Sequence, residues 1–509
     1  MNKRSKIISM ILAGIMILTL LLSCANDSGD ILSDDKNGNA NDSGVDNTGN
    51  NQSEAENKQE AKLPPPELPE IDLQGADFVI MSSEAWGLPL WEQRDIYAAE
   101  ETGDTVNDAV YKRNSIIDER YNCTIVEQKV KLEDITSKIK RFVAAGDSSL
   151  DAATIRLKQF SELVPTNNLV EFKRLTYIDT SKQWWDQNSV NDLSIAGKIF
   201  GVASDMTLMD KQSTCALAYG KKMQVDFAIE NLYQLVDEGK WTLDKLLELA
   251  KLVSVDVDGN GIMDDKDAYG LLYGRDSMTS FLSGSGEFVG GKDANDLPIL
   301  TLNTPKALEV LDKLYDILYD ERYCFHVMKF FDAQGTNYTD GMSVMFQDNR
   351  ALFMWVRMAD IESLRSMSTD FGILPIPKYD EKQEKYIQTV NPWVGVVTSV
   401  PQSAASFENS SVILEAMAYE SKYILQPAYY DVMLNTKIAR DEESSKMLDI
   451  IFANRRYDIG DVFDFGGLGN DVIFMTMTFD RNIVSTYEKK EAKALLAIEK
   501  LIENIQALD

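Results

Sequence analysis

The hydrophobic pattern of this chain begins with an almost unbroken apolar run over residues 7–22, which follows three basic residues among the first six. A basic start before a short apolar run is typical of a secretory signal peptide. The run is shorter than the roughly 20 apolar residues that a membrane-spanning helix needs. The pattern therefore predicts an exported protein, with an uncleaved membrane helix as the alternative.

Residues 21–24 read Leu-Leu-Ser-Cys, an ending that resembles the lipobox of bacterial lipoproteins. The resemblance implies a signal peptide over residues 1–23 and a lipid on the thiol of Cys24, at the extracellular face of the cell membrane. Residues 24–70 are rich in Asn, Asp, Gly and Ser and become proline-rich at 63–69. Such a segment buries too little apolar surface to offset its ordering entropy, so we expect a disordered tether.

From residue 71 onward, strand-like apolar segments alternate with segments of helical period. Strands are expected at residues 76–82, 123–126, 151–156, 198–202, 351–356, 371–374 and 394–400. Helices are expected at 107–119, 133–145, 230–237 and 243–252, with Thr242 as an N-cap, and the chain from 411 to its end should be mainly helical. This alternation predicts an α/β fold with parallel sheets. The roughly 440 residues after the tether favour at least two lobes.

Charge and reactive residues narrow the possible functions. A formal net charge of −30 argues against nucleic acid and against an anionic membrane surface as partners. The cysteines after the lipobox, Cys123, Cys215 and Cys324, lie far apart without metal-ligand spacing, which predicts buried thiols and no disulfide framework. The single histidine, His326, has no nucleophile beside it, so a Ser-His-Asp or Cys-His device is not indicated.

Residues 256–267 match an EF-hand calcium loop nearly position for position, with Gly261 at the sharp turn. The expected oxygen ligands are Asp256, Asp258, Asn260, Ile262 through its carbonyl, Asp264 and Asp267. The departure is Asp267, since an EF-hand has a bidentate Glu there, and the shorter side chain lowers the coordination number or the affinity. The sequence predicts a structural calcium site, with a solvated acidic turn as the alternative.

Several segments together resemble the extracellular solute-binding proteins (family 1, sugar-type) of bacterial ABC importers. The segments that carry the resemblance are residues 144–147, 197–202, 239–244, 349–354, 371–377 and 394–401. The resemblance covers roughly residues 75–455 and implies the type II periplasmic-binding fold, in which two α/β lobes joined by hinge strands close around a cleft. It implies lobe 1 at 71–205, lobe 2 at 206–392, a return to lobe 1 at 393–430, and C-terminal helices on lobe 2 at 431–509.

Residues just past strand ends are the candidate ligand contacts, because open α/β sheets bind ligands beyond the carboxyl ends of their strands. Sugars stack their C–H faces on aromatic rings, and polar neighbours read the hydroxyls. The candidates are Trp86, Arg156, Gln159, Asp205, Trp355, Arg357 and Trp393. Trp355 is the first choice for a stacking platform. The alternative for this and most other tryptophans is a place in the core.

The resemblance implies a monomeric, lipid-anchored receptor without catalytic activity. It would capture a small solute, a sugar or oligosaccharide, by lobe closure and deliver it to ABC permease subunits. An extracellular glycoside hydrolase is one alternative, because it also uses aromatic residues and paired carboxylates. A receptor that reports its ligand to a sensor kinase is the other. The sequence leaves the identity of the ligand open.

Overall fold

The computed structural model describes residues 62–85, 91–328, 338–435 and 442–508. The expected signal peptide, Cys24, most of the expected tether and Trp86 lie outside the described residues. None of the described helices combines the length and the apolar character needed to cross a bilayer. Free, buried thiols are confirmed for Cys123, Cys215 and Cys324.

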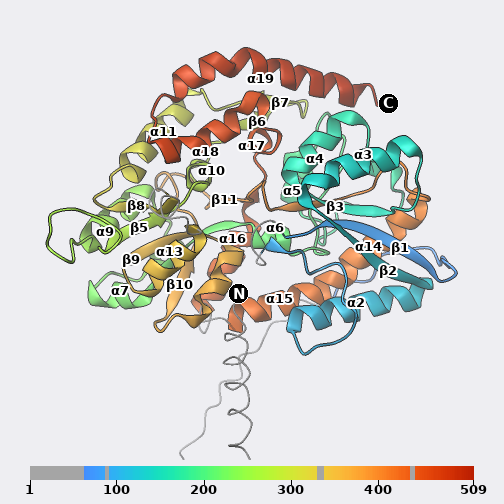
Figure 1. Ribbon diagram of the computed structural model, residues 1–509, viewed down its shortest axis with the longest axis horizontal. Coiled ribbons are helices and arrows are strands. Elements are labelled where there is room, and N and C mark those ends of the chain that lie inside the picture. Colours follow the sequence, from blue (N-terminus) through green and yellow to red (C-terminus); the bar gives the residue numbers. More distant parts are fainter. Residues whose placement is uncertain (1–61, 86–90, 329–337, 436–441, 509) are drawn as a thin grey trace, which may run out of the picture. The chain divides into compact units, whose positions relative to one another are not determined.

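The first sheet has the strand order β12-β3-β1-β2. Its strands are β1 (Ala76–Ser83), β2 (Cys123–Val130), β3 (Ala152–Arg156) and β12 (Val396–Ser399). β1 runs parallel to β2 and β3, whereas β12 pairs antiparallel with β3. Helices α2 (Thr105–Tyr121) and α14 (Phe407–Tyr423) cover one face, and α3 (Ile135–Ala145) and α4 (Leu157–Leu163) cover the other (Figure 1). Both faces are therefore buried, and we call this layered unit lobe 1.

The second sheet has the order β10-β4-β9-β5-β8 and forms the centre of lobe 2. Its strands are β4 (Cys215–Gly220), β5 (Tyr269–Tyr273), β8 (Cys324–His326), β9 (Ala351–Arg357) and β10 (Phe371–Leu374). β5 is parallel to β8 and β9, but β4 is antiparallel to both β9 and β10. The expectation of purely parallel sheets is therefore wrong for both lobes. β4 is the first strand of lobe 2 that the chain forms after it leaves lobe 1. It runs in the opposite direction to its two neighbours, β9 and β10.

The helices of lobe 2 are mostly short and surround the second sheet (Figure 1). They are α7 (Lys221–Asp226), α8 (Leu232–Asp237), α9 (Leu243–Val253), α10 (Ser277–Gly284), α11 (Pro305–Leu318), α13 (Tyr338–Gln347) and α16 (Glu442–Ala453). The side chain of Thr242 accepts a hydrogen bond from the amide of Lys245, so Thr242 caps α9 as predicted. Two small sheets pair β6 (Gly290–Lys292) with β7 (Pro298–Leu300), and β11 (Gln388–Thr389) with β13 (Arg455–Arg456).

The chain crosses between the lobes along three segments. The first carries α6 (Met209–Gln212) and leads into β4, and the second runs from β11 to β12. The third is α15 (Leu425–Asn435), which packs on α2 and α14, whereas α16 packs on α8 and β10 of lobe 2. The C-terminal helices are α17 (Ile459–Phe463), α18 (Leu468–Thr478) and the long α19 (Ile483–Gln506), which is seen along one edge of Figure 1.

Most expected strands and helices are confirmed within a few residues, but the strand expected at 198–202 is wrong. The chain there makes a tight turn, in which Ile195 and Lys198 exchange backbone hydrogen bonds and Ala196 and Gly197 have positive φ. Val202 contributes only an isolated bridge to Thr398 of β12. Only Val202 therefore pairs with the edge strand β12, through two backbone hydrogen bonds to Thr398, and the segment before it forms a turn and not a strand.

Candidate functional site

Three of the candidate residues meet where the lobes join. Arg156 ends β3, and its guanidinium donates to the carbonyl oxygens of Trp393 (3.3 Å) and Trp91 (3.1 Å). Arg357 ends β9 of lobe 2, and its guanidinium carbon lies 4.3 Å from the centroid of the Trp91 ring. Strand ends of both lobes therefore converge on Trp91, which lies in the loop after β1.

Trp91 contacts strand ends of both lobes, and it was not among the candidate residues that the sequence suggested. Its ring is buried in an apolar cluster with Met209, Ala359, Val394 and Val396. These neighbours come from the first two crossing segments, from β12 and from the turn after β9. The signal in the sequence was weak, because Trp91 stands eight residues past the end of β1 instead of directly after it.

Burial of the two arginines makes their charges costly, and each is compensated differently. Arg357 forms a two-pronged ion pair with Asp360, with Nε···Oδ2 at 3.0 Å and Nη2···Oδ1 at 3.2 Å. Arg156 has only carbonyl partners, and burial lowers its pKa to about 10. The Nε atom of Arg156 is buried without a hydrogen-bond partner among the described residues.

Trp393 presents the only substantially exposed indole ring among the described tryptophans, at 36% exposure. The ammonium group of Lys158, from α4, lies 5.1 Å from the ring centroid. Lys158 also pairs with Asp461 of α17, with Nζ···Oδ1 at 3.2 Å, and donates to the Asp461 carbonyl. An aromatic face beside a buried ion pair is an arrangement that suits a sugar ring.

Unpaired acceptors surround this ion pair. Burial raises the pKa of Asp461, and its Oδ2 atom has no hydrogen-bond partner among the described residues. The Oε1 atom of Gln159, also on α4, is likewise buried and without a partner there. Helices α4 and α17 pack against each other. Lys158 and Asp461 thus lie in one region with Trp393, which we call the Trp393 site, and Gln159 is the next residue after Lys158 on α4.

The remaining candidates lie elsewhere. Trp355 is fully buried in the middle of β9, opposite Leu217 of β4, and its ring lies 5.8 Å from the Arg357 guanidinium on the side away from solvent. Trp355 therefore lies in the core of lobe 2, which was the alternative to a stacking platform in the sequence analysis. Asp205 pairs with Lys211, with Oδ1···Nζ at 3.1 Å, on the first crossing segment. The structure therefore brings Arg156, Arg357 and Trp393 toward one region, and it does not bring Asp205 there.

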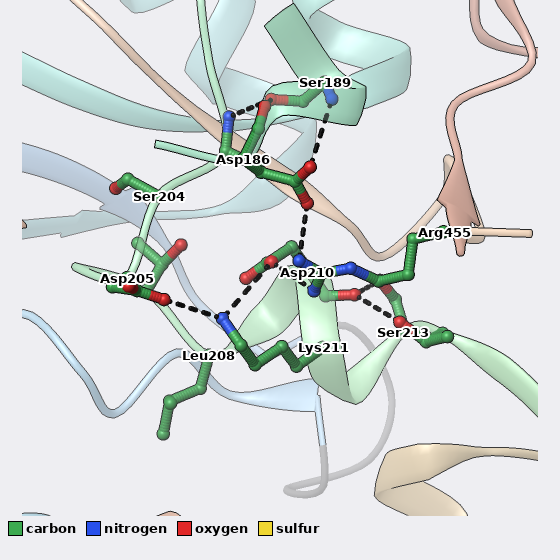
Figure 2. A network of polar contacts seen from close by, with 12 residues as sticks. Asp186, Ser189, Ser204, Asp205, Leu208, Asp210, Lys211, Ser213 and Arg455 are labelled. Carbon is green, nitrogen blue, oxygen red and sulfur yellow. Dashed lines mark hydrogen bonds and ion pairs between the residues drawn. The ribbon is translucent and has the colours of Figure 1, made fainter. Parts of the chain in front are cut away.

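Asp205 belongs instead to a buried ion network on the first crossing segment (Figure 2). Arg455 of β13 pairs with Asp210 of α6 at 2.7 Å and with Asp186 at 2.5 Å. Asp186 also caps α5 (Gln187–Leu193) in lobe 1 by accepting the amides of Asn188 and Ser189. One guanidinium therefore links lobe 1, the crossing segment and the small β11–β13 sheet.

The predicted calcium loop lies outside the Trp393 site, between α9 and β5. One carboxylate oxygen each of Asp256, Asp258 and Asp267 lie within 4.8 Å of one another. Asp267 is fully buried, and its two oxygens accept the amides of Val257 and Asp264. Hard carboxylate oxygens at this spacing fit calcium. Three of the six predicted ligands therefore have oxygens close enough to share one ion, and the other three predicted ligands are not part of this group.

Three solved structures share the fold of the chain at low identity. UspC of M. tuberculosis aligns with a TM-score of 0.55 and 14% identity, over 82% of this chain and 100% of that one. A cyclo/maltodextrin-binding protein complexed with maltotetraose aligns with a TM-score of 0.52 and 14% identity, over 85% and 96%. The ABC substrate-binding protein Lmo0181 from Listeria monocytogenes, in complex with cycloalternan, gives 0.50 and 13%, over 85% and 98%.

No protein-family model and no curated protein matches the chain. The structural likeness extends over nearly the whole length of each solved structure and over more than four fifths of this chain. The chain therefore has the two-lobed α/β fold of the periplasmic binding proteins.

Proposed function

We propose that this protein is an extracellular receptor that captures a small solute, a sugar or oligosaccharide, between its two lobes and delivers it to ABC permease subunits. The observation that carries the proposal is the Trp393 site. It combines an indole ring that is 36% exposed with the ammonium group of Lys158 beside that ring and the Lys158–Asp461 ion pair. The structural neighbours bound to maltotetraose and to cycloalternan support the same ligand class.

The proposal includes the membrane anchor that the sequence predicts. A lipid on Cys24 would hold the receptor at the outer face of the cell membrane, and the predicted tether at residues 24–70 would connect the anchor to the lobes. A receptor that reports to a sensor kinase would use the same capture step. The presence of permease genes beside this one would favour import.

Binding is favoured over glycoside hydrolysis because Asp458 is fully engaged, so that of Asp458 and Asp461 only Asp461 keeps an oxygen without a partner among the described residues. A glycosidase needs two carboxyl groups that flank the scissile bond, one of them free to donate a proton. Asp458 has its pKa raised to about 7 by burial, but its oxygens accept the amides of Val289, Gly290, Gly460 and Asp461. Asp461 holds Lys158. These groups stabilise the fold around the site.

Replacing Trp393 by alanine should weaken sugar binding about tenfold, because tenfold corresponds to about 1.4 kcal/mol and a stacked aromatic contact contributes about that much beyond its buried area. The measurement is calorimetric titration with maltotetraose, cycloalternan and mannotriose, the ligands named for structural neighbours. Tyr111→Ala is the matched control, since Tyr111 is equally exposed, at 37%, but lies on α2. If Trp393→Ala binds sugar with unchanged affinity, or if Trp393→Ala and Tyr111→Ala lose affinity equally, Trp393 does not contact the sugar.

We also propose that calcium occupies the loop at residues 256–267 and has a structural role. Calcium bound only to the folded state stabilises it, by about 2.7 kcal/mol at a hundredfold excess over the dissociation constant. The melting temperature should therefore rise with calcium, and Asp256→Ala combined with Asp258→Ala should abolish the rise. Asp265→Ala is the control, because Asp265 lies in the loop outside the ligand set. If the wild type gives identical melting curves in calcium and in chelator, the loop does not bind calcium and is only an acidic turn.

A further inference from the structure

One turn of lobe 1, at residues 194–198, forms hydrogen bonds with two separate elements that start from lobe 2. The chain just after the turn belongs to lobe 1, because Val202 pairs with Thr398 of β12. The two elements are the β6–β7 hairpin, which leads from α10 to α11, and the C-terminal end of α19. We call the turn and these two sets of contacts the lobe bridge.

The turn has two backbone amides that its own hydrogen bonds do not use. Those bonds run between Ile195 and Lys198. The two central residues, Ala196 and Gly197, have φ values of 53° and 74°, as in a type I′ turn. Their amides donate to Asp296 in the β6–β7 hairpin, that of Ala196 to the carbonyl oxygen and that of Gly197 to Oδ2, each at 2.9 Å. One residue of lobe 2 therefore satisfies both amides.

Side chains add to the contact between the hairpin and the turn. The hydroxyl of Ser194 donates to Oδ1 of Asp296 at 3.0 Å, and Lys292 Nζ donates to the Ser194 carbonyl oxygen at 3.2 Å. Lys292 also pairs with Asp296 and donates to the carbonyl oxygen of Asn191. The Lys292 and Asp296 side chains are 17% and 28% exposed, so water competes for these bonds and each is weak by itself.

Helix α19 provides the second contact of the lobe bridge. It starts on lobe 2, where Arg481 pairs with Asp316 of α11 at 2.7 Å. Its 24 residues span about 36 Å, and its later turns pack on η3 (Val164–Thr166) of lobe 1 (Figure 1). There Lys198 Nζ donates to the carbonyl oxygen of Ile505 at 2.9 Å. A cation is favourable at the C-terminal end of a helix, so the same turn of lobe 1 holds both elements.

The lobe bridge is connected to the Trp393 site through α17. Asp458, which caps α17, accepts the amides of Val289 and Gly290 at the start of the hairpin, at 2.7 and 3.1 Å. Three residues further along the chain, Asp461 forms its ion pair with Lys158. A rotation of one lobe against the other would therefore change the contacts of the lobe bridge and those of the site together.

We propose that the lobe bridge is a latch, which forms when the lobes close, breaks when they open, and slows the release of the captured solute. This role rests on the proposed capture of a solute between the lobes. The bonds of the lobe bridge join the same two bodies that the crossing segments join, so the lobes cannot separate until these bonds break. The solute and the lobe bridge both stabilise the closed arrangement, and their contributions act in the same direction.

The kinetic test is stopped-flow fluorescence with maltotetraose, cycloalternan and mannotriose. Asp296→Ala should raise the dissociation rate constant about tenfold, because the closed complex loses its latch, and Lys198→Met should change it in the same direction. The solute enters while the lobes are open, so the association rate constant should stay within about twofold of the wild type. Asn295→Ala in the same hairpin and Lys173→Met on the surface of lobe 1 are the controls and should change neither constant.

Hydrogen–deuterium exchange without sugar tests the latch independently of the ligand. A latch that breaks as a unit exposes both contacts at once. Asp296→Ala should therefore speed exchange at the turn and also in residues 500–508 at the end of α19, although Asp296 itself lies in the hairpin. Ser194→Ala removes a single hydroxyl and should have the same effect to a smaller extent, which keeps the test usable if Asp296→Ala folds poorly.

The two measurements separate the latch from the proposed function. If none of the sugars binds but Asp296→Ala speeds exchange at residues 500–508, the latch stands and the proposed ligand class is wrong. The latch is overturned if exchange at residues 500–508 stays at the wild-type rate in both Asp296→Ala and Ser194→Ala, or if Asn295→Ala speeds it equally. It is also overturned if a sugar that binds leaves Asp296→Ala at the wild-type rate or more slowly.

Discussion

Replacing Arg455 by methionine is expected to lower the free energy of unfolding by about 3–5 kcal/mol, the usual cost of breaking a buried ion pair from one side. Arg455 is buried between Asp186 and Asp210, which are themselves buried (Figure 2). Its removal leaves Asp186 without its cation and Asp210 with only Lys211, whose Nζ lies 3.8 Å from Oδ2. Because Asp210 lies on the first crossing segment, the loss falls on the hinge between the lobes.

Urea unfolding checks this expectation, and Arg456→Met is the matched control. Arg456 is adjacent and pairs with Asp192 at 2.8 Å, but its side chain is 42% exposed. Because Asp192 is buried while Arg456 is partly exposed, breaking this pair should cost less than breaking the fully buried Arg455 network, so this variant should lose clearly less stability than Arg455→Met. Adding Asp210→Asn to Arg455→Met should recover part of the loss, since it removes one of the stranded charges. Equal effects of Arg455→Met and Arg456→Met would contradict the role of the network.

Trp355→Ala should cost about 3–5 kcal/mol of stability, as large-to-small replacements of buried aromatic residues do. The ring is fully buried in the central strand of the second sheet, with β4 on one side and β5 on the other. Loss of the ring leaves a cavity that neighbouring strands cannot close. Thermal unfolding measures the effect, and Trp393→Ala, at a half-exposed ring, should barely change the melting temperature.

The same two variants separate stability from binding. The sequence made Trp355 the first choice for stacking a sugar, and its complete burial favours Trp393 for that role. Trp355→Ala, measured below its melting temperature, should bind sugar with nearly unchanged affinity. A variant that melts normally but binds at least tenfold more weakly would restore Trp355 to the site and contradict its place in the core.

The parts of the fold that follow from local pattern could be predicted from the sequence. β1, β3 and β9 are short apolar runs, and Thr242 caps α9 as its side chain and the following residues imply. The direction of β4 could not be predicted, because strand pairing depends on residues far apart in the chain. The apolar residues near Val202 resembled a strand, although the chain turns at Ala196 and Gly197 and only Val202 pairs with β12.

The candidate site was only partly predictable for a related reason. The rule that ligands bind past strand ends selected Arg156 and Arg357, which do meet at the lobe junction. It also selected Trp355, which is inside the strand that Arg357 ends. Trp91, Lys158 and Asp461 were missed, because their proximity depends on how α4, α17 and the loop after β1 pack together. The packing of these elements against one another cannot be predicted from the spacing of residues along the sequence.

The central claim, capture of a sugar by lobe closure, is tested most directly by small-angle X-ray scattering. The radius of gyration should be measured for the protein alone and with saturating maltotetraose, cycloalternan or mannotriose, alongside chromatography of the sugar over several hours. We predict that at least one of these sugars lowers the radius of gyration and is recovered intact. An unchanged radius of gyration with every sugar that binds, or the release of shorter products, would contradict the account.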